Sequence, residues 1–183
     1  MLFDALNGSL PERAAHDRSK SNMDTGSMTQ PPIQDSYPDD IAICYGCGRN
    51  NPHGLHIKTV WDGEEGVCRF TPQDYHTAFP GFVYGGLLAS LIDCHSVGTA
   101  IAAMYDAEQR PPGTDPEITA VTANLNVDYL KPTPIGVELV LRARIEELTP
   151  KKAIVTCSLY AGDIETVRGR VVAVRVPSRA AMG

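Results

Sequence analysis

The sequence lacks the motifs that mark several common catalytic and binding classes. Its 183 residues contain no G-x-S-x-G nucleophile motif, no Walker phosphate loop and no dinucleotide-binding glycine fingerprint. It also lacks an excess of basic residues, since its net charge is -6 at pH 7. A protein that binds nucleic acid needs a basic face for the phosphates, so this charge disfavours nucleic acid as a partner.

Signals for secretion and for membrane insertion are missing as well. The first residues, MLFDALNGSLPERAAHDR, have neither a basic start nor a continuous apolar segment, which makes them a poor signal peptide. No apolar run reaches the roughly 20 residues that span a bilayer, because Asp93 and His95 interrupt the best candidate. The five cysteines are an odd number and argue for reduced thiols. We therefore predict a cytoplasmic protein without a membrane partner.

The chain divides by composition into an arm and one folded domain. Residues 1–40 contain seven acids against three bases and are rich in Ser, Pro and Asp, without an apolar period. We expect this acidic arm to be flexible or docked on a partner subunit. Residues 41–183 are then the folded part, and the length suits a single domain.

The pattern within this domain predicts an α+β fold. Two short β-rich runs flank the turn signal DGEEG, and a long apolar helix then opens at Gly85 and runs to about Glu108. Strand-rich segments follow at 117–132, 137–148 and 153–176. One helix that is apolar all round, followed by long antiparallel strands, predicts a helix wrapped by a curved sheet, which is the hot-dog arrangement. Small helix residues such as Gly98 would let the sheet approach, and a second copy usually protects the edge strands of such a sheet.

The first of these strand segments alternates between apolar and polar residues. This period of two predicts two faces. One carries Val121, Ala123, Leu125, Val127 and Tyr129, and the other carries Thr122, Asn124, Asn126 and Asp128.

The long helix carries the residues best suited to chemistry. Gly85 and Gly86 stand at its start, where free backbone N–H groups can stabilise an oxyanion, although tight packing on a strand would also explain them. Asp93 follows about two turns later, where a carboxylate suits proton transfer or a structural hydrogen bond. His95 lies roughly 200° around the helix from Asp93, so the two cannot form a dyad. We interpret His95 as a core or interface histidine.

A second candidate is the segment CYGCGRNNPHGLH, which supplies Cys44, Cys47, His53 and His56. Cysteine and histidine together suit a tetrahedral zinc site. The spacing, however, does not match the usual zinc-finger patterns, and the glycines with Pro52 also fit a series of tight turns. We therefore expect neither a metal nor another cofactor.

Three motifs in order, CYGCGRNNPHGL, FPGFVYGGLLASLID and VTANLNVDYLKPTPIG, resemble the hot-dog acyl-CoA thioesterases. Within that family they are similar to the branch that contains the carboxy-terminal modulator thioesterase of mammals, and the likeness covers about residues 42–176. The resemblance implies a hydrolase that splits acyl-CoA thioesters. It also implies a homodimer, or a dimer of dimers, with active sites at the subunit interface.

The resemblance also implies site residues. Asp93 matches the catalytic aspartate, which acts as general base or nucleophile, and Gly85 matches the glycine whose N–H polarises the thioester carbonyl. Thr122 matches a residue that positions the water or the carboxylate. In related enzymes the glycine and the aspartate of one site come from different subunits. The candidate substrate-binding residues are Tyr84, Gly86, His76, Asn124 and Lys131.

Tyr84 departs from the family pattern, which places histidine before the two glycines. Because of this difference, the alternative that the protein binds acyl-CoA or another small ligand without catalysis stays open. A hot-dog hydratase is a third possibility, but it would pair an aspartate with a nearby histidine, and the helical angle between Asp93 and His95 opposes that pairing.

Overall fold

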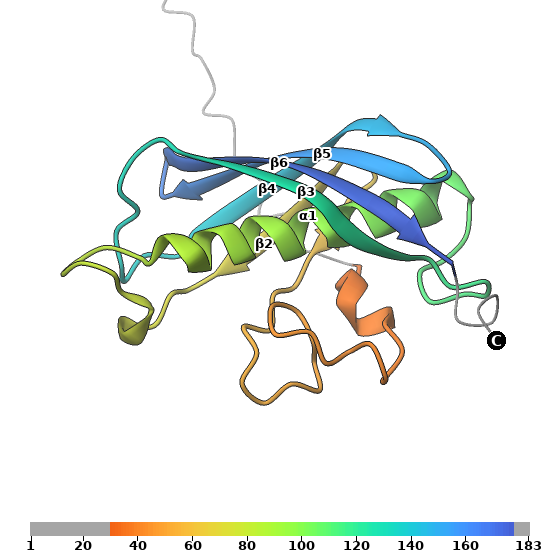
Figure 1. Cartoon of the computed structure of the whole chain (residues 1–183), viewed down its shortest axis with the longest axis horizontal. Coiled ribbons are helices and arrows are strands. Elements are labelled where there is room, and N and C mark those ends of the chain that lie inside the picture. The colour runs from red at the N-terminus through yellow and green to blue at the C-terminus, as the bar shows by residue number, and fades with distance from the viewer. Residues whose placement is uncertain (1–29, 178–183) are drawn as a thin grey trace, which may run out of the picture.

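A six-stranded antiparallel sheet curves around one long helix. The computed structural model describes residues 30–177, and the elements in chain order are η1 (Ile33–Ser36), β1 (Val60–Trp61), β2 (Glu65–Phe70), η2 (Asp74–His76), α1 (Gly85–Ala107), β3 (Thr119–Tyr129), β4 (Leu139–Leu148), β5 (Lys152–Ala161) and β6 (Ile164–Val176). The predicted α+β hot-dog fold is confirmed. Figure 1 shows α1 lying along one face of the curved sheet.

The strand order places β3 at one edge of the sheet. The order is β1-β2-β4-β5-β6-β3, and all neighbouring strands are antiparallel. β3 pairs with β6 along one side only, so the backbone groups along its other side have no strand partner among the described residues. Such a long free edge is a site for pairing with a second strand.

The core lies between α1 and the sheet. Strand residues at every second position point to the helix and lose almost all contact with solvent, as the period of a strand requires. They are Leu139, Leu141, Ala143, Val155, Cys157, Leu159, Val167, Val171 and Ala173. The opposite face of the sheet is polar and carries ion pairs, among them Glu65 with Arg142 and Glu146 with Arg170.

Two glycines of the sheet set how closely it approaches α1. A Cβ on Gly66 would lie 2.0 Å from Thr99 Oγ1, and one on Gly169 would lie 2.2 Å from Ile92 Cγ2. The small helix residue Gly98 serves a different contact, because a Cβ there would lie 2.7 Å from Gln34 Nε2 in the preceding segment. The close approach predicted for small helix residues therefore depends mainly on glycines in the strands.

By length and composition α1 could span a membrane, which differs from our expectation that Asp93 and His95 would exclude this. In the fold, however, 72% of its apolar window is buried. Figure 1 shows α1 lying against the sheet, and most of its side chains are buried, as in the core helix of a folded domain.

The packed domain begins before the predicted boundary at Ile41. Ile33 and Gln34 in η1 are buried, and Gln34 exchanges two hydrogen bonds with Thr59: its Nε2 donates to Thr59 Oγ1 at 3.1 Å, and the Thr59 N–H donates to its Oε1 at 2.8 Å. The final part of the predicted acidic arm thus belongs to the domain. Residues 1–29 lie outside the described residues.

Replacing Leu141 by alanine tests the core contact of β4 with α1. Leu141 is fully buried, so Leu141→Ala should lower the free energy of unfolding by about 2–5 kcal/mol, through lost burial and a cavity. The matched control is Leu148→Ala at the exposed end of the same strand, where the loss should be about 1 kcal/mol or less. Chemical denaturation measures both, and equal losses would contradict the described packing.

Candidate active site

Asp93 and Thr122 meet across the contact between α1 and β3. The hydroxyl of Thr122 donates a hydrogen bond to one carboxylate oxygen of Asp93, and the Asp93 side chain is half-buried. A hydrogen bond of this kind fixes the orientation of a carboxylate while leaving its second oxygen available. The structure thus brings together two of the three predicted catalytic residues.

A β-bulge in β3 lies next to this contact. Thr122 pairs with Ala173 of β6 and Asn124 pairs with Val172, so Ala123 has no partner of its own. Cross-strand partners share a face of the sheet, and Ala173 faces α1. Thr122 therefore points to the helix, as Leu125 does beyond the bulge. The predicted strict alternation, with Thr122 opposite to Leu125, is wrong because it did not include the extra residue.

A cavity of about 380 Å³ opens beside Asp93. Asp93 and Thr122 form part of its wall, together with the side chains of Cys44, Val97 and Ile101. This lining is mostly apolar with a few polar groups, which is typical of a site that binds a small organic molecule.

The start of α1 presents free donors, as predicted. The backbone N–H groups of Gly85 and Gly86 have no acceptor among the described residues, whereas the N–H of Leu87 donates to Tyr84 O at 3.1 Å. Both glycines are half-buried and lie at the positive end of the helix dipole. They can therefore bind a carbonyl oxygen that gains negative charge.

Aromatic side chains surround this helix start. Tyr84 is 57% exposed, and its ring covers Gly86, where a Cβ would lie 2.4 Å from Tyr84 Cε1. Tyr129 donates from its hydroxyl to Gly85 O at 2.8 Å. Tyr129 was not among our predicted site residues. It lies within the motif VTANLNVDYLKPTPIG, but its place on the apolar face of the strand gave little reason to select it.

His76 also lies next to the helix start, because its carbonyl accepts the Tyr84 N–H at 2.8 Å. Its Nδ1 accepts the Gln73 N–H at 3.0 Å, which leaves Nε2 to carry the proton of the neutral ring. Partial burial lowers the pKa of His76. A neutral imidazole with a donor at Nε2 can bind a substrate oxygen.

The other two predicted substrate-binding residues differ in position. Lys131 is exposed just beyond β3. The backbone carbonyl of the nearby Thr133 accepts the Val83 N–H, so Lys131 lies at the same end of α1 as Gly85. Asn124 pairs with Val172 and points to the face of the sheet opposite α1. The structure therefore does not bring Asn124 together with Asp93 within one chain.

His95 lies in the core, away from the cavity. It is fully buried, and its Nδ1 is 2.9 Å from Thr59 Oγ1. Burial lowers its pKa to about 3, so the ring is neutral at pH 7. This agrees with the interpretation of His95 as a core histidine and removes the aspartate–histidine pair that a hydratase would need.

The cysteine–histidine segment folds differently from the pairing considered above. Cys44 and Cys47 lie with Cys94 of α1, and all three sulfurs are within 4.8 Å of one another, while His53 and His56 do not join them. The hydrogen bond between the two side chains lowers the pKa of Cys44 to about 5 and raises the pKa of Cys94, because it favours a thiolate at one sulfur and a thiol at the other. Cys94 was not among the candidate ligands that the sequence indicated.

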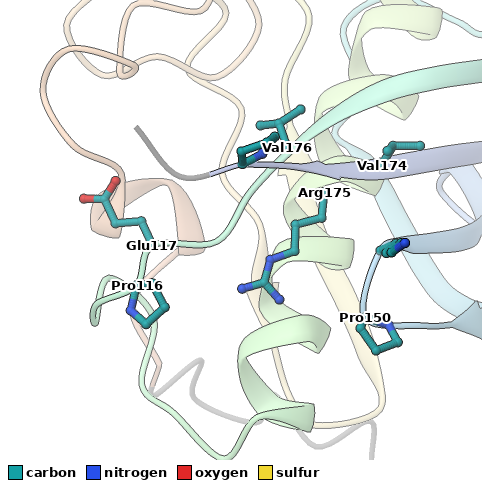
Figure 2. Close-up of a pocket in the computed structure, with 8 residues that line it drawn as sticks. Pro116, Glu117, Pro150, Val174, Arg175 and Val176 are labelled. Carbon is teal, nitrogen blue, oxygen red and sulfur yellow. The ribbon is translucent and has the colours of Figure 1, made fainter. Parts of the chain in front are cut away.

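A second hollow of about 460 Å³ lies near the end of β6. Figure 2 shows it between Pro116 and Glu117 on one side and Pro150 and Arg175 on the other. It contains none of the predicted site residues.

Comparisons with known proteins agree with the hot-dog fold. The sequence model of the thioesterase superfamily matches residues 80–168, which include α1 and β3 to β5. The acyl-coenzyme A thioesterase THEM4 of Xenopus laevis is 31% identical over 97 residues, which are 53% of this chain and 38% of that protein. Acyl-coenzyme A thioesterase 13 of Mus musculus is 33% identical over 82 residues, which are 45% of this chain and 51% of that protein. The match thus spans about half or less of these relatives.

Solved structures extend the comparison over more of the fold. A thioesterase superfamily protein from Shewanella loihica is 46% identical, with a TM-score of 0.54, and the match covers 68% of this chain and 95% of that one. The protein smu.793 from Streptococcus mutans, solved bound to acetyl CoA, is 18% identical with a TM-score of 0.55, and this likeness concerns the fold alone. From the identity across nearly the whole Shewanella protein and the helix-in-sheet architecture, we conclude that the chain belongs to the thioesterase superfamily.

Proposed function

We propose that this protein hydrolyses acyl-CoA thioesters to a free acid and CoA. The observation that carries the proposal is the Asp93 carboxylate, oriented by the Thr122 hydroxyl at the wall of an apolar cavity. The relatives named acyl-coenzyme A thioesterases support the same substrate class. We also propose a cytoplasmic location, which the five free cysteines suit.

The proposed reaction uses the Asp93 carboxylate and the Gly85 N–H. As general base, Asp93 takes a proton from a water molecule, whose oxygen attacks the thioester carbon. The Gly85 N–H stabilises the negative carbonyl oxygen until the carbon–sulfur bond breaks and the CoA thiolate leaves and takes up a proton. As nucleophile, Asp93 would attack the carbon itself to form an anhydride, which water then opens. Thr122 orients the carboxylate in either route.

One chain cannot bring its own Gly85 N–H and its own Asp93 to the same thioester. Gly85 and Asp93 are eight residues apart on the same straight helix, which separates them by about 12 Å along its axis. A carbonyl oxygen and the water that attacks its carbon are much closer than this. We therefore propose that the Gly85 of a second copy completes the site around Asp93.

The free edge of β3 suits such a partner. Its exposed apolar side chains include Val121, Leu125 and Tyr129, which are 50%, 38% and 55% exposed. Pairing of two β3 edges in a homodimer would cover them and join the two sheets. Two such dimers could then associate further into a dimer of dimers.

The aromatic groups at the helix start provide substrate contacts in this proposal. Tyr84, which replaces the histidine of the family pattern, and the neutral His76 flank the free N–H groups of Gly85 and Gly86. Lys131, which is exposed at the same end of α1, would bind a CoA phosphate. The alternative is a protein that binds acyl-CoA without turning it over, which Tyr84 favours.

Replacing Asp93 separates these two functions. Asp93→Asn should lower kcat/KM for acyl-CoA hydrolysis by about 10²–10⁴, because the proton acceptor or nucleophile is lost while the shape is kept. Release of free thiol from a panel of acyl-CoA substrates measures this. The control is Asp106→Asn, an exposed carboxylate on the same helix, which should match the unaltered protein. Tight binding of acyl-CoA with equal background release by all three proteins would favour the binding protein.

Two replacements of Thr122 test its hydroxyl. Thr122→Val keeps the volume but removes the donor, and a hydrogen bond to a charged group contributes about 1.5–3 kcal/mol, so kcat should fall roughly 10- to 100-fold. Thr122→Ser keeps the hydroxyl and should retain most of the activity. Steady-state kinetics would contradict the proposed role if both variants lost activity equally.

Mixing two inactive variants tests the shared site. Gly85→Pro removes the N–H at the first helical position, where proline is tolerated, and the extended Tyr84 before it also accepts proline. This variant should lose about 10²–10³ in kcat, and Asp93→Asn should also be inactive. After mixing and subunit exchange, about a quarter of the activity should return, since half the dimers are mixed and each has one intact site. No recovery, with mixed dimers demonstrated by mass spectrometry, would place both residues of a site in one chain.

A further inference from the structure

Three cysteine sulfurs converge where the loop before β1 meets α1. Cys44 and Cys47 come from this loop and Cys94 from the helix, and their sulfurs all lie within 4.8 Å of one another. The sulfurs of Cys44 and Cys94 are 3.9 Å apart although the residues are 50 positions apart in sequence. All five cysteines of the chain are free thiols.

The spacing of the sulfurs matches metal ligation. Zinc–sulfur bonds of about 2.3 Å place the sulfurs of a tetrahedral site about 3.8 Å apart. The Cys44–Cys94 distance of 3.9 Å is close to this value, whereas a disulfide would bring the atoms to about 2.05 Å. The three thiols therefore need little movement to hold one ion.

The loop is built for this close approach. A Cβ on Gly46 would lie 2.2 Å from the sulfur of Cys94, so only glycine lets the turn between Cys44 and Cys47 rest on that side chain. The turn is also held in place, because Gly46 O accepts the Ile57 N–H at 3.0 Å and Tyr45 O accepts the Leu55 N–H at 2.8 Å. Two ligands from a fixed turn and one from a long helix form a preorganised set.

The cluster is open to the cavity beside Asp93. Cys44 is exposed and Cys94 half-buried, and all three cysteines line the same cavity as Asp93. An ion could therefore enter from solvent, and three thiolates would leave its fourth position facing the cavity. Thiolate ligands select soft or borderline cations such as Zn²⁺ over Mg²⁺ or Ca²⁺.

We propose that Cys44, Cys47 and Cys94 form a three-thiolate binding site for a zinc-like divalent cation. The ion joins the loop before β1 to α1 one residue from Asp93, and each thiol gives up its proton as it binds. This site departs from our expectation of no metal, and it uses Cys94 in place of the histidines His53 and His56. It does not depend on the proposed hydrolase activity.

Cobalt spectroscopy on the full-length protein tests the site. The reduced, metal-free protein is titrated with Co²⁺, and one equivalent per chain should produce thiolate-to-cobalt charge-transfer bands together with the visible bands of a tetrahedral site. Zn²⁺ should bleach these bands as it displaces the cobalt. Zinc should also raise the thermal midpoint of the protein, because an ion that binds only the folded state stabilises it.

Cysteine variants locate the ligands. Cys44→Ser and Cys94→Ser should weaken Zn²⁺ binding by more than the roughly 10- to 100-fold that follows loss of an outer-shell partner. Cys68→Ala and Cys157→Ala, which change buried cysteines outside the cluster, should bind as the unaltered protein does. Circular dichroism tests whether each variant is folded. We expect Cys44→Ser to disturb the fold least, because Cys44 is exposed.

Two results would overturn the proposal. One is the absence of stoichiometric cobalt bands in the reduced protein. This result would overturn the proposal even if mild oxidation of the protein joined Cys44 to Cys94 or Cys47 in a disulfide. The other is metal binding that survives in both Cys44→Ser and Cys94→Ser. Absence of thioesterase activity in a protein that still binds the metal would contradict the proposed hydrolase function and not the metal site.

Discussion

The packing of α1 against the curved sheet is the contact on which the rest of the structure depends. Gly66 and Gly169 let the strands approach Thr99 and Ile92, and this fixes the height and rotation of the helix. Because α1 is long and straight, its position also determines where Gly85, Asp93 and Cys94 lie. Groups that are carried on a rigid element are placed more accurately than groups on loops. The position of α1 therefore fixes the helix start, the Asp93 carboxylate and the sulfur cluster relative to one another.

Periodicity was sufficient to predict most of this fold. The apolar helix and the strand segments are long, and α1, β3 and β4 begin and end within a few residues of their predicted bounds, while the segment 153–176 contains the two strands β5 and β6. The Asp93–Thr122 contact was expected from family resemblance, while alternation alone placed Thr122 on the wrong face. The cause is one unpaired residue, Ala123, which is neither glycine nor proline and so gives no sign of a bulge in the sequence.

Contacts between distant segments account for the other differences. In the sequence Cys44 and Cys47 are nearest to His53 and His56, but the loop turns back onto α1 and meets Cys94 instead. In the same way Ile33 and Gln34 looked like part of a polar arm, and their burial depends on Thr59 and Gly98. No local pattern contains such information, because it is set by how two elements pack.

The bulge in β3 also has a geometric effect on how copies of this chain could meet. A strand without Ala123 would keep Thr122 and Leu125 facing α1, since the two flanking halves would then alternate regularly. The extra residue is therefore not what selects the inward side chains. It bends the edge strand and increases its twist at that point. Strand length at this one position can thus adjust the angle between two joined sheets while the partner of Asp93 stays in place.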